Sequence, residues 1–60
     1  MKLYVEPMDT VVVAVDSEGR VRYENDEAWS TLSLQERRAI IYAAEKEIEA
    51  LTEVLEMLSA

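Results

Sequence analysis

The sequence has no cysteine, no histidine and no phenylalanine, and it has only one glycine and one proline in 60 residues. Without Cys and His it has no zinc finger, no disulfide framework and no Cys–His nucleophile pair. Basic residues are also few, since six Lys and Arg stand against thirteen Asp and Glu, for a net charge of −7. Because phosphate contacts need clustered Lys and Arg, we do not expect direct binding to nucleic acid.

Long apolar runs are missing as well. No stretch approaches the roughly 20 residues of a membrane span. Residues 1–15 lack the basic segment and the following apolar segment of a signal peptide. We therefore expect a cytoplasmic protein, in the host cell cytoplasm if it is phage-encoded, with no membrane contact. The composition is 50% apolar, which argues against a disordered acidic tail.

The length predicts one small domain, residues 1–60. A domain of this size buries about 60% of the surface that its unfolded chain exposes. Natural mini-proteins of this length usually add disulfides, a metal or oligomerisation. Because Cys and His are absent, we expect no cofactor and no metal. Oligomerisation or docking on another protein is then the expected source of additional burial.

Three segments predict β-strands. Residues 2–6 and 20–24 alternate between apolar and polar side chains, and residues 10–16 are rich in valine. Residues 7–9 contain the only proline, which favours a strand end or a turn. Residues 16–19 end in the only glycine and predict a type I turn with a left-handed last residue. Two short connections predict a three-stranded antiparallel meander with the valine-rich strand in the middle.

Alternation also predicts the two faces of this sheet. The inner face is expected to hold Leu3, Val5, Val11, Val13, Val15, Val21 and Tyr23. Tyr4, Val12 and Ala14 then fall on the outer face among charged residues. This outer trio packs on a solvated sheet or, as the alternative, forms a second small contact site.

Residues 34–58 contain neither Gly nor Pro and predict one long helix of about 37 Å. Ser33 and Glu36 have the spacing of a capping box at its start. The preceding residues 25–31 are expected to form a connection that can hold one helical turn, capped by Asn25 or Asp26. The predicted fold class is therefore α+β, with the element order β-β-β-α.

The predicted helix carries more apolar surface than its sheet can cover. One stripe consists of Ile41, Ala44, Ile48, Leu51, Leu55 and Leu58, and a second of Ile40, Ala43, Ala50, Val54 and Met57. Together they span about 200° of the helix, whereas a surface helix needs little more than 100°. A sheet about 15 Å wide also cannot cover the full helix length, so the end around residues 54–58 is predicted to protrude.

Three arrangements accommodate the uncovered apolar surface. A homodimer pairs two helices across a two-fold axis, the helix docks on a different protein, or a broken helix folds its own end back. The homodimer is the favoured arrangement. The residues expected at this dimer or partner interface are Ile40, Ile48, Leu51, Val54, Leu55, Met57 and Leu58.

Acidic residues form two groups. Glu45, Glu49, Glu53 and Glu56 follow one another at helical spacing and form a ridge, which we call the acidic ridge. Such a ridge opposes helix stability, because like charges repel and acids near the C-terminus oppose the helix dipole. It either imitates phosphates for a basic groove or keeps an apolar helix soluble.

The second group is Glu24, Asp26 and Glu27, which precede the only tryptophan, Trp29. The spacing of a calcium loop is absent, so no metal site is expected there. Trp29 either anchors a partner, as Trp does in binding hot spots, or closes the core between the sheet and the helix start, which is the favoured alternative.

These features predict a small acidic non-catalytic binding protein rather than an enzyme. The chain has no histidine and only two lysines, Lys2 and Lys46, and no acid–base cleft is expected. The leading hypothesis is an inhibitor or modulator that occupies a surface of another protein. In size and charge the chain is similar to inhibitors encoded by phages and mobile elements. The alternatives are a nucleic-acid-mimicking decoy for a basic groove, acting through the acidic ridge, and a purely structural homodimerisation module.

Overall fold

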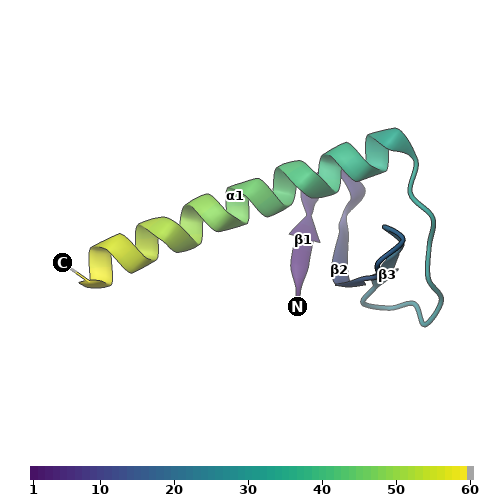
Figure 1. The fold of residues 1–60 in the computed structure, drawn as a ribbon, viewed down its shortest axis with the longest axis horizontal. Coiled ribbons are helices and arrows are strands. Elements are labelled where there is room, and N and C mark those ends of the chain that lie inside the picture. The colour runs from purple at the N-terminus through teal and green to yellow at the C-terminus, as the bar shows by residue number, and fades with distance from the viewer. Residues whose placement is uncertain (60) are drawn as a thin grey trace.

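The computed structural model describes residues 1–59, which form a three-stranded antiparallel sheet and one long helix (Figure 1). The strands lie in the order β1-β2-β3, as a meander. The elements in chain order are β1 (Leu3–Val5), the 3₁₀ helix η1 (Glu6–Met8), β2 (Thr10–Val15), β3 (Val21–Tyr23) and α1 (Leu34–Ser59). The predicted α+β fold class and the β-β-β-α order are confirmed.

The turn between β2 and β3 is organised by the Asp16 carboxylate. It accepts hydrogen bonds from the backbone N–H groups of Glu18 (2.9 Å) and Arg20 (2.8 Å) and from the Arg20 Nε (2.7 Å). Gly19 has φ of 77°, the left-handed conformation predicted for it. Desolvation opposes ionisation of Asp16, but the hydrogen bonds from Arg20 and Glu18 outweigh it and lower the pKa of this carboxyl.

The inner face of β2 differs from the prediction. Val12 lies opposite Leu3 of β1 and is fully buried, whereas Val11 lies opposite the exposed Tyr4. Residues directly opposite each other point to the same face, so Val12 belongs to the inner face and Val11 to the outer one. The assignment of Val11 inward and Val12 outward was therefore wrong by one residue.

A register shift between Val12 and Ala14 explains how the second half of β2 regains the predicted phase. The additional residue of a β-bulge changes which later side chains face the core. Val15 lies opposite Val21, as predicted for the inner face, but it is half exposed at the end of the strand. The segment from Val11 to Val15 is apolar at every position, so it carries no alternation that marks this shift.

The core is small. Among the described residues its five buried side chains are Leu3, Val5, Val12, Val21 and Ile40, and the partly buried Met8, Tyr23, Leu32, Ala39, Ala43 and Ala44 pack around them. Only the first part of α1 takes part, through contacts with β1 and η1. Among residues 1–59 no polar or charged side chain is buried.

The connection between β3 and α1 contains no helical turn, so that prediction was wrong. Instead Ser30 forms an isolated antiparallel bridge with Val21, with backbone N to O distances of 2.7 and 3.0 Å. The carboxylate of Asp26 accepts a hydrogen bond from the N–H of Ala28 (3.0 Å), which replaces the predicted helix cap. The sequence did not predict this pairing with β3, because a bridge made by the single residue Ser30 leaves no repeating pattern in the sequence.

Trp29 is 43% exposed and does not belong to the core, so the favoured prediction for it was wrong. Its neighbour Ser30 lies opposite Val21, whose side chain faces the core. Since successive side chains of extended backbone point to opposite faces, the bridge turns Trp29 away from the core.

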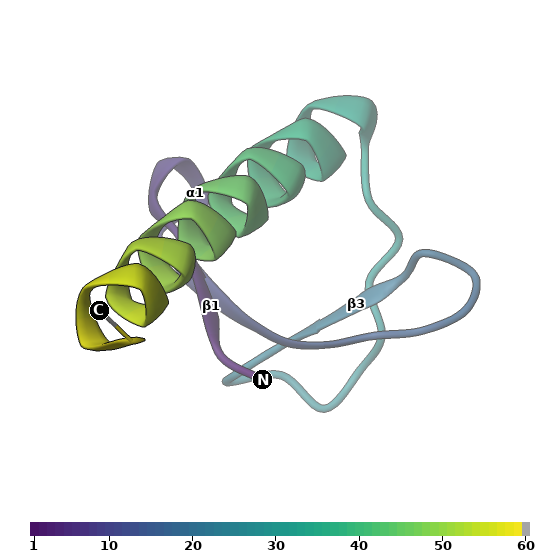
Figure 2. The same ribbon diagram turned by 60° about the vertical axis from the view of Figure 1, so that its left-hand side comes forward.

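Helix α1 begins with the predicted capping box. The N–H of Glu36 donates to the Ser33 Oγ (3.1 Å), and the Ser33 N–H donates to the Glu36 Oε1 (2.8 Å). The helix continues without interruption over 26 residues, so the broken-helix arrangement is excluded for this chain. It extends well beyond the sheet and gives the molecule extents of 42 × 23 × 21 Å (Figures 1 and 2).

Candidate interaction surfaces

The C-terminal half of α1 is not covered by any other element of residues 1–59. Every residue from Glu45 to Ser59 is exposed, and this half of the helix projects past β1 (Figure 2). The predicted protrusion of residues 54–58 is confirmed, and it begins about two and a half turns earlier than expected. The reason is that α1 packs mainly on β1 and η1, and only the beginning of the helix reaches the core.

One exposed apolar face of α1 is formed by Ile41, Ile48, Leu51, Leu55 and Leu58, which we call the outer stripe. Each of these side chains is at least half exposed. Their spacings of 7, 3, 4 and 3 are those of a seam that pairs with another helix. Five large aliphatic side chains in one line form a contiguous patch, whereas isolated exposed apolar residues have no such significance.

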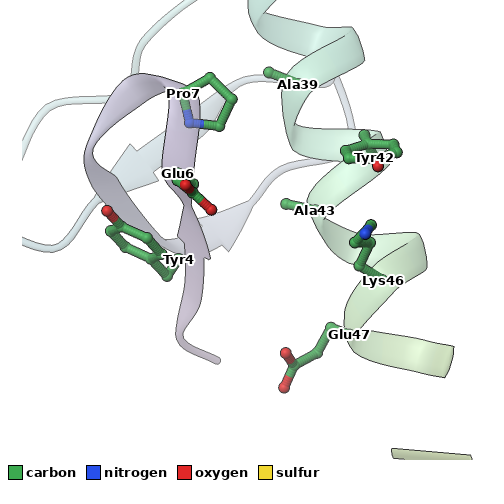
Figure 3. A pocket seen from close by; sticks show the side chains of 8 residues that line it. All are labelled: Tyr4, Glu6, Pro7, Ala39, Tyr42, Ala43, Lys46 and Glu47. Carbon is green, nitrogen blue, oxygen red and sulfur yellow. The ribbon is translucent and has the colours of Figure 1, made fainter. Parts of the chain in front are cut away.

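A second exposed face borders a groove between β1 and α1 (Figure 3). The groove has a volume of about 550 Å³ and is lined by Tyr4, Glu6, Pro7, Ala39, Tyr42, Ala43, Lys46 and Glu47. The small side chains of Ala39 and Ala43 form its wall on the helix, as Figure 3 shows. The Lys46 ammonium lies 5.3 Å from the centre of the Tyr42 ring.

The same side of α1 continues as a shallower hollow lined by Ala50, Glu53, Val54, Met57 and Leu58. Successive residues along this side are three or four positions apart, so they share one helix face. We call this the groove face, and it comprises Ala39, Ala43, Lys46, Ala50, Val54 and Met57. At about 100° per residue it lies on the other side of the helix from the outer stripe.

The predicted interface residues divide between these two faces, with one correction. Ile40 is buried in the core of its own chain and is not available to a partner. It packs on the sheet side of the helix with Leu3, Val5, Val12 and Val21. Of the other predicted interface residues, Val54 and Met57 lie on the groove face. Ile48, Leu51, Leu55 and Leu58 lie on the outer stripe.

The groove itself was not predicted from the sequence. Tyr4 and Pro7 are distant from Tyr42 along the chain and meet it only because β1 and η1 pack on α1. The available signal was the pair of alanines, Ala39 and Ala43, one turn apart at the helix start. Alanine there allows a neighbouring element to approach closely, but it does not identify that element.

The acidic ridge is fully solvated. Glu45, Glu49, Glu53 and Glu56 are all exposed. Within residues 1–59 the ion pairs are those of Lys2 with Glu24 and of Arg20 with Asp16 and Glu18, and none of them involves α1. The ridge therefore presents uncompensated negative charge beside both apolar faces of the helix.

The second acidic group lies at the opposite end of the molecule from the C-terminus of α1 (Figure 1). Glu24 is bound to Lys2 (3.1 Å), and Asp26 is used by its own loop. Glu27 and Trp29 are exposed. The two acidic groups thus do not combine into a single surface.

Tyr4 lies at the edge of the groove on β1. The Tyr4 hydroxyl donates a hydrogen bond to the Asp9 carboxylate (3.1 Å). This bond, together with desolvation and the charges of Asp9 and Glu6, raises the pKa of Tyr4. Tyr4 therefore lines the groove with its neutral ring, while its hydroxyl is held by Asp9 and points away from α1 (Figure 3).

No group of three or more acidic, His or Cys side chains within residues 1–59 has the geometry to hold a metal ion. In the same part of the chain, no helix combines the length and the apolar character needed to cross a membrane. No protein-family model matches the sequence, and comparisons with curated proteins and with solved structures find no similar protein.

Proposed function

We propose that this protein is a small non-catalytic binding protein that inhibits or modulates a target protein by occupying one of its surfaces with the outer stripe of α1. The observation that carries the proposal is the exposure of five large aliphatic side chains in one helical seam. Amphipathic helices that insert an apolar face into a groove bind in this way, with anchors at helical spacing.

The charge of the helix indicates the chemistry of the target surface. Residues 45–56 contain five Glu and one Lys, and the acidic ridge flanks the outer stripe. A complementary surface is an apolar groove bordered by Lys and Arg side chains. Opposite charge steers such partners together and selects against acidic surfaces.

The burial pattern supports a binding role without catalysis. Acid–base catalysis relies on titratable groups whose pKa is tuned by burial or by close charged neighbours in a cleft. No charged side chain among residues 1–59 is buried. Binding by an exposed helix needs no such group.

The test is affinity capture from a lysate of the source cells, with wild-type protein and two matched variants. Leu55→Glu places an acid on the outer stripe, and Ala50→Glu places the same acid on the groove face one turn away. We expect a target retained by wild type and by Ala50→Glu but lost with Leu55→Glu. Its binding should weaken as salt rises from about 0.1 to about 1 M. A target retained equally by Leu55→Glu contradicts the proposal.

A decoy function is the second candidate, because the acidic ridge is solvated and unpaired. The double variant Glu45→Gln with Glu49→Gln distinguishes it. A decoy should lose its target when these two charges are removed and should keep it with Leu55→Glu. Hydrophobic docking by the outer stripe gives the reverse pattern.

A further inference from the structure

We infer that the groove face binds a second copy of this chain, with the two α1 helices antiparallel across a two-fold axis. This goes beyond the proposed function, because the groove face and the outer stripe lie on different sides of the helix. A dimer formed in this way leaves both outer stripes exposed for a target.

Side-chain size along the groove face is self-complementary only in the antiparallel orientation. The first half of the face carries Ala39 and Ala43, and the second half carries Val54 and Met57. Antiparallel helices set Val54 against Ala43 of the second copy, and Met57 against its Ala39. Large side chains then fill the space that small ones leave. Parallel helices instead place alanine on alanine and methionine on methionine.

Charge on the same face favours the same orientation. Lys46 is the only base after Arg38 and lies near the middle of the groove face, with Glu53 two turns further on. Antiparallel pairing brings Lys46 toward Glu53 of the second copy, and symmetry produces this pair twice. Parallel pairing sets each of these residues beside its own copy, which is repulsive.

The available area matches the lower range of specific interfaces. Large apolar side chains each remove roughly 60–120 Å² from water on burial, from their transfer free energies at about 25 cal/mol/Å². The groove and the hollow beyond it offer five per copy outside the outer stripe: Tyr4, Pro7, Tyr42, Val54 and Met57. Two copies together bury about 900 Å² in this way, which is in the range of weak, reversible complexes. A chain with five buried side chains among residues 1–59 also gains the burial that its own fold lacks.

Cysteine cross-linking tests the orientation, and the absence of native cysteine makes the background clean. Ala43→Cys and Val54→Cys in one chain lie about 16 Å apart along α1, too far for an internal disulfide. On oxidation we expect a covalent dimer from this double variant and none from either single variant. Cross-linking of the single variants indicates parallel helices and overturns the inference.

Light scattering on wild type and on two single variants tests which face of α1 forms the dimer. We expect wild type and Leu55→Glu at about twice the chain mass and Ala50→Glu at the monomer mass, with equal helix content by circular dichroism. A monomeric wild type, or dimeric Ala50→Glu, overturns the inference. This outcome is distinguishable from a failure of the proposed function. If the proposed function fails, Leu55→Glu still captures the target, but the masses measured by light scattering stay as expected.

Discussion

Two adjacent isoleucines show how sharply α1 divides between core and surface. Ile40 is 9% exposed and is the only buried residue of the helix, whereas Ile41 is 50% exposed. Consecutive helix positions are about 100° apart, so one side chain enters the sheet core and the next one leaves it. Substituting each of the two residues therefore gives a matched comparison of how much the core contributes to the free energy of unfolding.

We expect Ile40→Ala to lower the free energy of unfolding by about 2–4 kcal/mol, because it leaves a cavity among Leu3, Val5 and Val12. Ile41→Ala should cost at most about 0.5 kcal/mol in the folding of one chain. Since a core of this size supplies roughly 3–5 kcal/mol, Ile40→Ala should retain only about 1 kcal/mol of folding stability at 25 °C. Urea denaturation followed by circular dichroism measures both variants. Equal losses contradict the assignment of Ile40 to the core.

At the scale of elements, the start of α1 depends on the reciprocal hydrogen bonds of Ser33 and Glu36. The Glu36 carboxylate accepts hydrogen bonds from Ser33, which lower its pKa below the ordinary 4.5, with desolvation opposing in part. A carboxyl whose pKa is lowered by folding stabilises the folded state above its ordinary pKa, and this contribution is lost as pH falls through the lowered value.

We therefore expect wild type to have a higher melting temperature than Glu36→Gln at pH 7. The difference should shrink as the pH falls from about 4.5 toward the lowered pKa and vanish below it. Taking the difference between wild type and Glu36→Gln removes the effect of protonating the other acids, because that effect is common to both proteins. Ser33→Ala, which removes the Oγ acceptor, should cost about 1 kcal/mol. A pH-independent difference contradicts an ionised Glu36 in the cap.

The elements with local signals were predictable from the sequence. The capping box determines where α1 begins, and the glycine after Asp16 determines the turn between β2 and β3. Positions that depend on partners along other strands were not predictable. Val12 faces the core because it lies opposite Leu3, and Trp29 faces away because Ser30 pairs with Val21.

The candidate surfaces also differ in whether they could be predicted from local sequence. The outer stripe was predictable because its residues share one helix and one period. The groove was not, because it is formed by β1, η1 and α1 together. Of the predicted interface residues, Ile40 is buried in the core of its own chain, because the sheet uses a residue that the helix period assigns equally well to a partner. The other six are exposed, and their place in an interface stays a prediction.

At the scale of the whole molecule, a net charge of −7 acts on every association that the chain makes. Two copies repel each other, and the Lys46–Glu53 pairs proposed between them lie on an exposed face. Exposed ion pairs contribute at most about 1 kcal/mol each. The general repulsion and these local attractions therefore compete, and salt screens both.

Rising salt is expected to change the Kd of the dimer and the Kd of the target complex in opposite directions. Between about 0.1 and about 1 M salt the Debye length falls from about 10 to about 3 Å, which screens the repulsion between two acidic chains. We expect the dimer Kd, measured by sedimentation equilibrium, to fall several-fold over this range, while the Kd for a basic target rises. Lys46→Gln should weaken the dimer mainly at low salt, where its attraction to Glu53 is least screened. A wild-type dimer that dissociates as salt rises would show that ion pairs, rather than the apolar contacts of Val54 and Met57, hold the two copies together.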